Sequence, residues 1–373
     1  MKAWTLTHGL LQSETQMKNR LDNIKPAVRS LRAYSLSPHR ARIKINQNEN
    51  PWDTPAAIRD EVMFRFETRK WSRYPDFLPA SLHEQLAEFA GLRPDQVIAG
   101  NGSNELIQAL LMVTIGPGKR VLILEPTFAL YRQVTIVLGG TVESISLTSS
   151  LQYNSDLLLS IVEERQPDVT IICSPNNPSG CVLYDEDLVK LLRLARGLVV
   201  IDEAYHEFAE HSVVPLLKDH DNLVVLRTFS KAMALAALRV GYLMTDSDLA
   251  REIRKAVLPY NLNAFSQMAA EVAIEKYESD LRPLVKRIIG ERERLFWELA
   301  KIRSLVPVAS RGNFMVVRTE IEPHSIFEEL LQRDVLVRDV SSYPMLKHYF
   351  RVSVGRPEEN DHLLAGLREI CDE

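Results

Sequence analysis

The sequence has few cysteines, no long apolar run and no excess of one charge. Three cysteines in 373 residues, Cys173, Cys181 and Cys371, form no C-x-x-C pair, so we expect no disulfide framework and a reducing compartment. No apolar run approaches the roughly 18 residues of a membrane span, and residues 1–16 lack the apolar core of a secretory signal. The net charge of −4 offers no electrostatic surface for nucleic acid. These absences predict a soluble cytoplasmic protein that binds neither membrane nor nucleic acid.

Zinc-type histidine spacing is also missing. The nine histidines are scattered without H-x-x-x-H or H-E-x-x-H spacing, so no metal site is predicted. The chain is long: its 373 residues are more than a single hydrophobic core usually serves. We therefore expect two domains.

Short apolar runs alternate with helical patterns along the first two thirds of the chain. The runs are β-branched or leucine-rich and cover residues 121–124, 169–173, 198–202, 223–227 and 240–244. Between them, residues 104–115 and 185–195 show the i, i+3, i+4 apolar spacing of helices. This alternation predicts an α/β fold, a mostly parallel sheet covered by helices on both faces.

The pattern changes near residue 266. A long helical stretch over 267–303 is followed by strands at 314–318, 335–340 and 350–354, with helices near 325–332 and 358–370. We predict an N-terminal arm over residues 1–45, a large α/β domain over 46–265 and a smaller α+β domain over 266–373. The arm is polar, basic in places and only weakly periodic, which indicates that it needs a partner surface.

Lys231 is the most informative residue because of its neighbours. Thr228 and Ser230 place two hydroxyls beside it, and Arg239 follows eight positions later. A lysine amine condenses with an aldehyde, whereas hydroxyls and a planar guanidinium bind phosphate oxygens. Nearby positive charge and partial burial should lower the lysine pKa. A lone lysine is usually a surface residue, but this cluster predicts a site for pyridoxal phosphate (PLP).

Asp202 ends the apolar run 198–202. A carboxylate there is unfavourable without a partner, and a pyridinium N–H is a suitable one, although a helix N-cap is the ordinary alternative. Tyr205 is within reach of the phenolic oxygen of the same ring, or is a half-buried core tyrosine. Asn177 follows the run 169–173 and is a second candidate for that oxygen, although Pro, Asn and Gly clusters often form simple turns.

A glycine-rich turn, Gly100-Asn101-Gly102-Ser103-Asn104, opens the predicted helix 104–115. Free N–H groups at a helix start, together with the helix dipole, favour phosphate binding. The alternative is a tight turn with an N-cap serine or asparagine. Four such motifs in the order that PLP requires indicate a PLP site more strongly than any one alone.

Together these segments resemble the fold-type I PLP-dependent aminotransferases, and within them the histidinol-phosphate aminotransferases, from about Pro26 to the end of the chain. The motifs that carry the resemblance are Asn48-Glu49-Asn50-Pro51, Tyr74-Pro75-Asp76, residues 100–105, Pro126-Thr127-Phe128, residues 175–178, Asp202-Glu203-Ala204-Tyr205, residues 228–231, Arg239-Val240-Gly241-Tyr242 and residues 351–355.

The resemblance implies a role for each matched residue around the cofactor. Lys231 would bind the cofactor aldehyde and later move the proton, Asp202 would pair with the pyridine nitrogen, and Phe128 would stack on the ring. The phenolic oxygen would be held by Asn177 and Tyr205. The phosphate would be bound by Gly102, Ser103, Asn104, Thr228, Ser230 and Arg239. Tyr74 would reach the phosphate of a neighbouring subunit, which implies a homodimer.

On the substrate side, Arg351 would bind the α-carboxylate of an amino donor such as glutamate. Arg338, thirteen positions earlier, would bind a substrate phosphate or the distal carboxylate of glutamate, unless it forms a salt bridge with Asp339 or Asp334. Tyr34 would close over the substrate or anchor the arm by packing. Asn50 would also bind the substrate.

The implied activity is ping-pong transamination between histidinol phosphate and 2-oxoglutarate, in histidine biosynthesis. An aromatic amino-acid aminotransferase would present nearly the same motifs, and a PLP-dependent lyase or decarboxylase would keep the same cofactor residues. A transcription regulator is disfavoured, because the arm before Pro51 is too short and irregular for a winged helix-turn-helix module.

Two features depart from the family pattern. Residues 232–238 carry alanines where the family usually has glycines, which is not expected to abolish cofactor binding. The first 20 or so residues exceed the usual family start, so either they form an extension or Met17 is the natural start.

Overall fold

The structure, a computed structural model, describes residues 20–33 and 38–372. The first of these segments belongs to a unit of its own and holds a 3-10 turn, Arg20–Asn23, and a short helix, α1 (Pro26–Arg29). The Ser30 hydroxyl donates to the Ala27 carbonyl at 2.9 Å and closes the last turn of α1. The second segment holds all the other elements.

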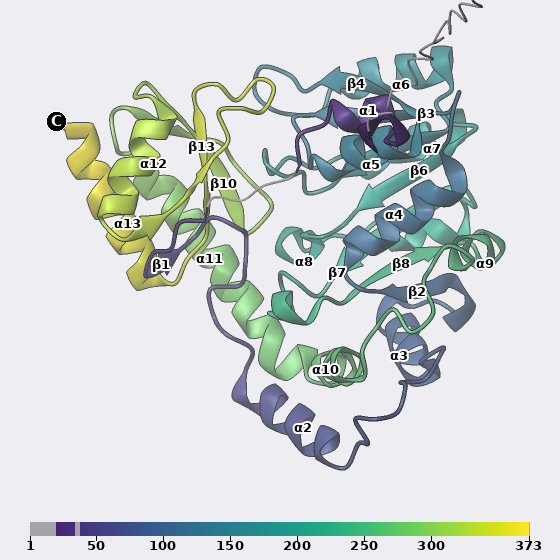
Figure 1. The fold of residues 1–373 in the computed structure, drawn as a ribbon. Helices are drawn as coiled ribbons and strands as arrows, with labels where there is room; N and C mark the ends of the chain where they lie inside the picture. The colour runs from purple at the N-terminus through teal and green to yellow at the C-terminus, as the bar shows by residue number, and fades with distance from the viewer. Residues whose placement is uncertain (1–19, 34–37, 373) are drawn as a thin grey trace, which may run out of the picture. The chain divides into compact units, whose positions relative to one another are not determined.

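A seven-stranded sheet forms the centre of the second unit (Figure 1). Its strand order is β2-β8-β7-β6-β5-β3-β4, and β8 alone runs opposite to the other six strands. The strands are β2 (Val97–Gly100), β3 (Arg120–Glu125), β4 (Thr141–Ser146), β5 (Val169–Cys173), β6 (Leu198–Asp202), β7 (Leu223–Thr228) and β8 (Gly241–Thr245).

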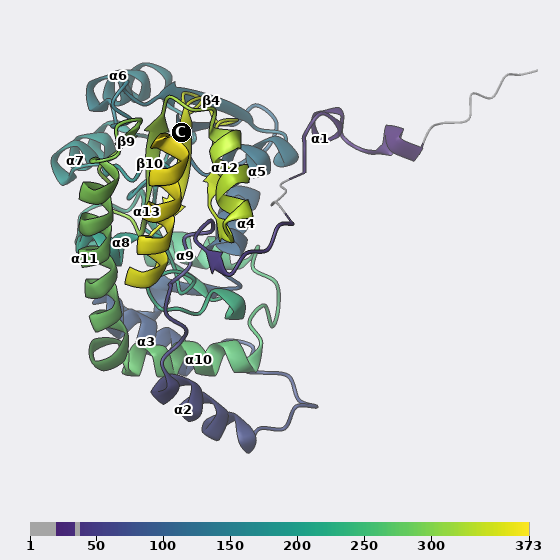
Figure 2. The same ribbon diagram turned by 90° about the vertical axis from the view of Figure 1, so that its left-hand side faces the viewer.

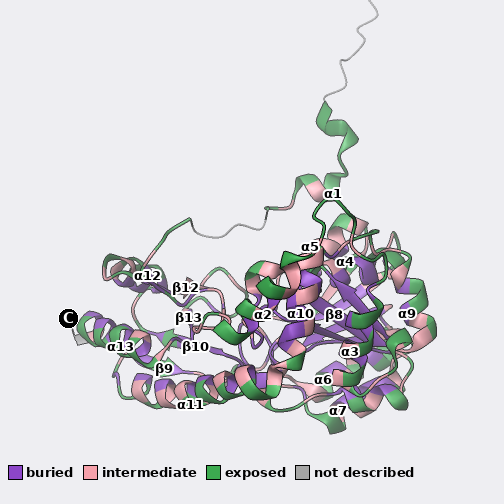
Figure 3. Cartoon of the chain, turned by 90° about the horizontal axis from the view of Figure 1, so that it is seen from below, coloured by how far each residue is buried: buried purple, intermediate pink, exposed green. Residues whose placement is uncertain are grey.

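Helices cover both faces of this sheet because its inner strands are apolar on both sides. In β6, for example, Val199 and Ile201 pack into one apolar cluster and Val200 into another. Helices α2 (Ala56–Glu67), α3 (Ala80–Ala90), α6 (Ser155–Arg165), α7 (Asp185–Leu194) and α10 (Ala264–Glu275) supply the first cluster. Helices α4 (Ser103–Thr114), α5 (Leu130–Leu138) and α9 (Ser247–Arg254) supply the second. Figure 3 shows the buried strands between helices whose outer sides are exposed.

The C-terminal part forms a smaller antiparallel sheet of order β12-β13-β10-β9. Its strands are β9 (Leu305–Pro307), β10 (Phe314–Thr319), β12 (Arg338–Asp339) and β13 (Tyr349–Ser353). It packs with helices α11 (Arg282–Leu299), α12 (Pro323–Gln332) and α13 (Pro357–Asp372), which Figure 2 shows side by side. A separate two-stranded parallel sheet pairs β1 (Ile43–Lys44) with β11 (Val335–Leu336), so the chain near residue 45 is tied to the C-terminal part.

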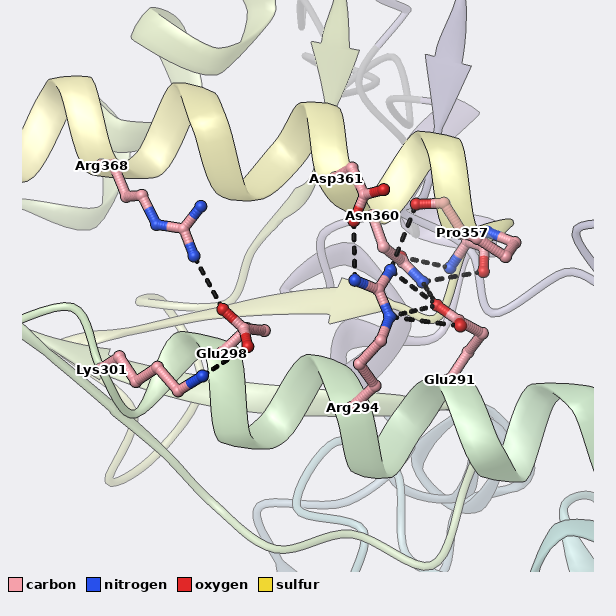
Figure 4. A network of polar contacts seen from close by, with 9 residues as sticks. Glu291, Arg294, Glu298, Lys301, Pro357, Asn360, Asp361 and Arg368 are labelled. Atoms are coloured by element: carbon pink, nitrogen blue, oxygen red, sulfur yellow. Dashed lines mark hydrogen bonds and ion pairs between the residues drawn. The ribbon is translucent and has the colours of Figure 1, made fainter.

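Ion pairs join α11 to α13 across the surface of this part (Figure 4). Arg294 contacts Asp361 at 2.7 Å, and Arg368 contacts Glu298 at 2.8 Å. These side chains are about one quarter to two thirds exposed, so each pair is expected to contribute less than about 1 kcal/mol. Shorter helical segments complete the unit: α8 (His206–Ala209), the π-helical turn Tyr277–Leu281, and the 3-10 turns Pro94–Gln96, Val214–Lys218 and Ala236–Leu238.

The α/β fold, with its mostly parallel sheet, is confirmed, and two predicted elements need correction. The helical stretch over 267–303 is interrupted by the π-helical turn, and α11 restarts at Arg282 with Pro283, which has no N–H to continue a preceding helix. The predicted strand 335–340 is divided, because β11 pairs with β1 whereas β12 pairs with β13. The domain boundaries at 45/46 and 265/266 remain predictions. No helix in the described segments is long and apolar enough to cross a membrane.

Candidate active site

Polar side chains gather where the parallel strands β5, β6 and β7 end. Asn177 follows β5, Asp202 ends β6 and Thr228 ends β7. The strands are adjacent and in register, with Cys173 opposite Asp202 and Asp202 opposite Leu226. Because the carboxyl edge of a parallel sheet is where loops and helix N-termini converge, a ligand site is expected there.

Lys231 lies in the turn that follows β7 and is partly buried. Its Nζ donates to the carbonyl of Gln47 at 2.9 Å and lies 5.9 Å from the centre of the Tyr205 ring. Burial, reinforced by the positive charges of Arg351 and Arg239, lowers the pKa of Lys231 to about 8. The expected decrease is confirmed, and it leaves a useful fraction of the amine neutral and nucleophilic near neutral pH.

Thr228, Ser230 and Arg239 form one hydrogen-bonded cluster beside this lysine. The Thr228 hydroxyl donates to Ser230 Oγ at 3.0 Å, and Arg239 Nη1 donates to the same oxygen at 3.0 Å. The predicted convergence of two hydroxyls and a guanidinium is therefore present. Such a cluster suits a phosphate, which accepts several charge-assisted hydrogen bonds at once.

Gly102 brings the start of α4 against this cluster. Its φ is +76°, and a Cβ at this position would lie 2.5 Å from Arg239 Nη2, so only glycine fits without displacing the guanidinium. A Cβ on Gly241 would lie 2.4 Å from the Ser103 backbone nitrogen. The first amides of α4, those of Ser103 and Asn104, have no intrahelical acceptor and favour an anion. Asn104 is exposed, and its backbone N–H is one of these first amides.

Asp202, the last residue of β6, is buried, with 3% of its surface exposed. Its Oδ1 accepts the Ala204 N–H at 3.0 Å, and its Oδ2 accepts the Tyr131 hydroxyl at 2.6 Å. Burial raises the pKa of Asp202, and these two hydrogen bonds oppose the increase. A buried carboxylate with so few partners is well suited to a pyridinium N–H.

The hydroxyl of Tyr205 is held by two amide side chains. Asn48 Nδ2 and Asn177 Nδ2 donate to it at 3.1 and 3.2 Å. Arg351 Nη1 in turn donates to Asn177 Oδ1 at 2.6 Å, and its Nη2 donates to the Asn46 carbonyl at 2.7 Å. The predicted convergence of Asn177 and Tyr205 is therefore present, and Arg351 extends it to the C-terminal sheet. Together these groups can hold a phenolic oxygen and a carboxylate.

Two of the other predicted site residues, Phe128 and Asn50, lie near the residues described above. Phe128 is half-buried and meets the Tyr131 ring edge-on, with ring centres 5.6 Å apart. Asn50 Nδ2 donates to the carbonyl of Ala232 at 3.2 Å, next to the lysine. Tyr74 is 80% exposed and stacks on Tyr260, so it takes no part in the phosphate cluster of its own chain. Tyr34 lies outside the described residues.

Arg338 and Arg351 are direct partners across β12 and β13. Side chains of residues opposite one another on antiparallel strands point to the same face of a sheet, so both arginine side chains lie on one face of this sheet. The salt bridge considered for Arg338 is not formed within the described segments. Asp339 lies instead beside a histidine of α12, and Asp334 beside an arginine that precedes β1.

The alanine-rich turn after Lys231 adopts the backbone that glycine would favour. Ala234 has a φ of +55°, in the left-handed region. Its carbonyl accepts the Thr54 hydroxyl at 2.8 Å, and the Leu235 N–H donates to the Phe229 carbonyl at 3.0 Å. The turn thus forms with an alanine in a position that suits glycine, at an intrinsic cost of about 1 kcal/mol.

Several residues of the site were not identified from the sequence as site residues. Tyr131 lies within an ordinary amphipathic helix, and Asn48 was noted only as part of a motif. Glu203 and Arg227, which are next to Asp202 and Thr228 in the sequence, form a buried ion pair at 2.9 Å. The one available signal was this position in the sequence, because Glu203 follows β6 and Arg227 lies in β7, each beside a predicted site residue.

The partly buried lysine, the phosphate cluster and the buried aspartate at the carboxyl edge of a mostly parallel sheet define a PLP-dependent enzyme of fold type I. Residues 41–367 match the family of class I and II aminotransferases, and the chain belongs to this family. The residues fit the cofactor, because Ser230, Arg239 and the first amides of α4 are donors suited to its phosphate, and the buried Asp202 carboxylate is an acceptor suited to its pyridinium N–H.

The chain is 38% identical to the histidinol-phosphate aminotransferase of Chlorobium phaeobacteroides, over 94% of this chain and 97% of that protein. Its fold matches that of the histidinol-phosphate aminotransferase from Sinorhizobium meliloti in complex with pyridoxal-5'-phosphate, with a TM-score of 0.83, 22% identity and coverage of 94% and 98%. It also matches L-threonine-O-3-phosphate decarboxylase from Porphyromonas gingivalis, with a TM-score of 0.78, 20% identity and coverage of 89% and 100%. The fold alone therefore does not distinguish amino transfer from decarboxylation.

Proposed function

We propose that this aminotransferase interconverts histidinol phosphate and its keto phosphate, with 2-oxoglutarate and glutamate as the second pair, in histidine biosynthesis in the cytoplasm. The observation that carries the proposal is the 38% identity to a histidinol-phosphate aminotransferase over nearly the full length of both chains. The paired arginines of β12 and β13 fit it, because each substrate of this reaction carries a phosphate or carboxylate groups besides the reacting amine or carbonyl.

Each residue around the cofactor has one task in this proposal. Bound PLP supplies an electron sink for the charge left at the substrate Cα when its proton is removed. Lys231 would hold the cofactor aldehyde, and its free Nζ would take the proton from the substrate Cα. Asp202 keeps the pyridine nitrogen protonated, while Asn177 and Tyr205 hold the phenolic oxygen. Thr228, as part of the phosphate cluster with Ser230 and Arg239, fixes the phosphate end.

Arg338 and Arg351 divide the recognition of substrate anions. Arg351 is anchored by Asn177 and by the Asn46 carbonyl, and so lies next to the cofactor groups, where it binds an α-carboxylate. Arg338 is half-buried on the same face of the sheet and binds the phosphate of histidinol phosphate or the distal carboxylate of glutamate. Phenylalanine has neither a phosphate nor a distal carboxylate, so it needs Arg338 least.

The substrate assignment is tested by Arg338→Gln, with kcat/KM measured for histidinol phosphate and for phenylalanine. A hydrogen bond to a charged group contributes about 1.5–3 kcal/mol, so we expect a loss on the order of 10- to 100-fold with histidinol phosphate and little loss with phenylalanine. Arg318→Gln is the matched control, because Arg318 is an exposed arginine on the same sheet. Equal losses for both substrates would remove Arg338 from phosphate recognition.

We also infer that the enzyme is a homodimer. Large aromatic side chains are exposed on α2 and in the loop after it: Phe64 is 72%, Trp71 84% and Tyr74 80% exposed. Tyr74 stacks on Tyr260 at 4.5 Å, and Phe77 meets Tyr260 edge-on at 5.5 Å, which links two separate loops into one surface. A connected apolar surface of this kind favours a protein partner, and a second copy of the chain is the commonest one.

Mixed dimers test whether Tyr74 acts in the neighbouring site. Lys231→Ala and Tyr74→Ala chains are each purified, then mixed under conditions that exchange subunits. If Tyr74 serves the partner's site, a mixed dimer has one site that carries both changes and one intact site, so activity returns on mixing. Activity that stays at the level of the separate variants would place Tyr74 outside the partner's site. A single-chain mass by light scattering would refute the dimer itself.

A further inference from the structure

The Asp202 carboxylate accepts a hydrogen bond from one side chain of another element, Tyr131 of α5. No lysine, arginine or histidine of residues 20–33 and 38–372 forms an ion pair with it, and its hydrogen-bond donors are the Ala204 N–H and the Tyr131 hydroxyl. The contact with Tyr131 is short, at 2.6 Å, and both residues are buried, Tyr131 completely. An O–H to carboxylate hydrogen bond of this length belongs to the strong, charge-assisted kind.

Tyr131 is itself held firmly in α5. Its carbonyl accepts the Thr135 hydroxyl at 2.8 Å, and its ring meets Phe128, the proposed stacking residue, edge-on. The other titratable groups that face Asp202 are Cys173 on β5, Tyr153 before α6, and Glu203 and Tyr205 in the loop after β6. None of these four donates a hydrogen bond to its carboxylate within the described segments, so Tyr131 is the side chain that fixes its orientation.

We propose that Tyr131 is a positioning residue, which fixes Asp202 in its carboxylate form and so keeps the proton on the pyridine nitrogen of the cofactor. The inference rests on the role proposed above for Asp202. A carboxylate and a pyridine nitrogen that share a proton compete for it according to their basicity. The Tyr131 hydroxyl lowers the basicity of Asp202 by stabilising its negative charge, and therefore favours the proton on the ring nitrogen.

The test is Tyr131→Phe, observed by nitrogen NMR of the holoenzyme loaded with cofactor that is isotopically labelled at the ring nitrogen. We expect the ring-nitrogen signal to move from the protonated toward the unprotonated position, and the affinity of the apoenzyme for PLP to fall on the order of tenfold. Tyr153→Phe is the matched control: its hydroxyl donates to the Cys173 carbonyl at 2.5 Å rather than to Asp202, so its signal should not move. An unchanged signal in Tyr131→Phe, or an equal movement in Tyr153→Phe, would overturn the proposal.

A second variant separates this inference from the role of Asp202. Asp202→Asn removes the carboxylate, and an unchanged ring-nitrogen signal in that variant would refute the pyridine pairing itself. If Tyr131→Phe does not fold, 3-fluorotyrosine at position 131 keeps the ring and makes the hydroxyl a stronger donor. The signal should then move further toward the protonated position, and a movement in the opposite direction would contradict the proposal.

Discussion

The pKa of Lys231 gives the most quantitative prediction about the site. An amine attacks an aldehyde only in its neutral form, and burial beside Arg351 lowers the pKa of Lys231 from 10.5 to about 8. At pH 7 a pKa of about 8 leaves about one amine in ten neutral, against about one in three thousand at 10.5, a difference of roughly 300-fold. The structure therefore predicts that cofactor capture by the apoenzyme is fast near neutral pH.

The assay mixes apoenzyme with PLP between about pH 6 and pH 10 and follows the visible absorbance of the lysine-bound cofactor. The same reaction with N-acetyl-lysine corrects for the ionisation of the cofactor itself. The enzyme rate should rise about tenfold per pH unit up to about pH 8 and then level off, whereas the rate with the free amine continues to rise. The ratio of the two rates, in which the ionisation of the cofactor cancels, should therefore be constant below about pH 8 and fall above it. Enzyme and free-amine rates that rise in parallel up to pH 10 would refute the reasoning.

Two variants test why the pKa of Lys231 is low, because they should shift the pH at which the rate levels off in opposite directions. Arg351→Gln removes a positive neighbour and should raise the pKa of Lys231, whereas Glu49→Gln removes a negative neighbour and should lower it.

The low pKa of Lys231 also makes the stability of the apoenzyme depend on pH. Since the folded pKa lies below the unfolded one, Lys231 contributes stability above about pH 10.5 that is lost as the pH falls through about 8.

Two further predictions concern the groups around the cofactor. Gly102→Ala should weaken PLP binding more than tenfold because its Cβ would displace Arg239, whereas Gly118→Ala, with a similar φ but nothing within 4 Å, should only lower stability by about 1 kcal/mol. Equal effects on PLP affinity in a binding titration would contradict this account. Glu203→Gln and Arg227→Met should each lower the free energy of unfolding by about 3–5 kcal/mol, and the double variant by less than the sum. Additive losses in urea denaturation would show that the pair is not coupled.

Local patterns predicted those parts of the fold and site that lie close together in sequence. Five of the seven central strands were predicted because they are buried on both faces and read as continuous apolar runs. Strand β4 was missed because it lies at the sheet edge with Ile145 as its one buried residue, and β2 because it is four residues long and contains Ala and Gly. The phosphate cluster was predictable because Thr228, Ser230 and Arg239 lie close together in sequence, from the end of β7 to just before β8.

Contacts between distant segments could not be read from local patterns. Tyr131 and Asp202 are 71 positions apart, and Asn48 and Tyr205 are 157 positions apart. Each of these pairs meets only because the strand order of the sheet and the return of the N-terminal segment bring them together. An amphipathic pattern shows that a tyrosine in α5 is buried, but not which carboxylate its hydroxyl meets.

The most direct test of the proposed activity is a single-turnover titration of the holoenzyme. Histidinol phosphate, and separately phenylalanine, is added without an amino acceptor, and the conversion of lysine-bound cofactor to pyridoxamine phosphate is followed by absorbance. We expect conversion far faster with histidinol phosphate than with phenylalanine. Equal or faster conversion with phenylalanine would contradict it and indicate an aromatic aminotransferase. No conversion with either substrate, from a preparation that shows the lysine-bound cofactor, would contradict amino transfer from histidinol phosphate and favour a lyase or decarboxylase.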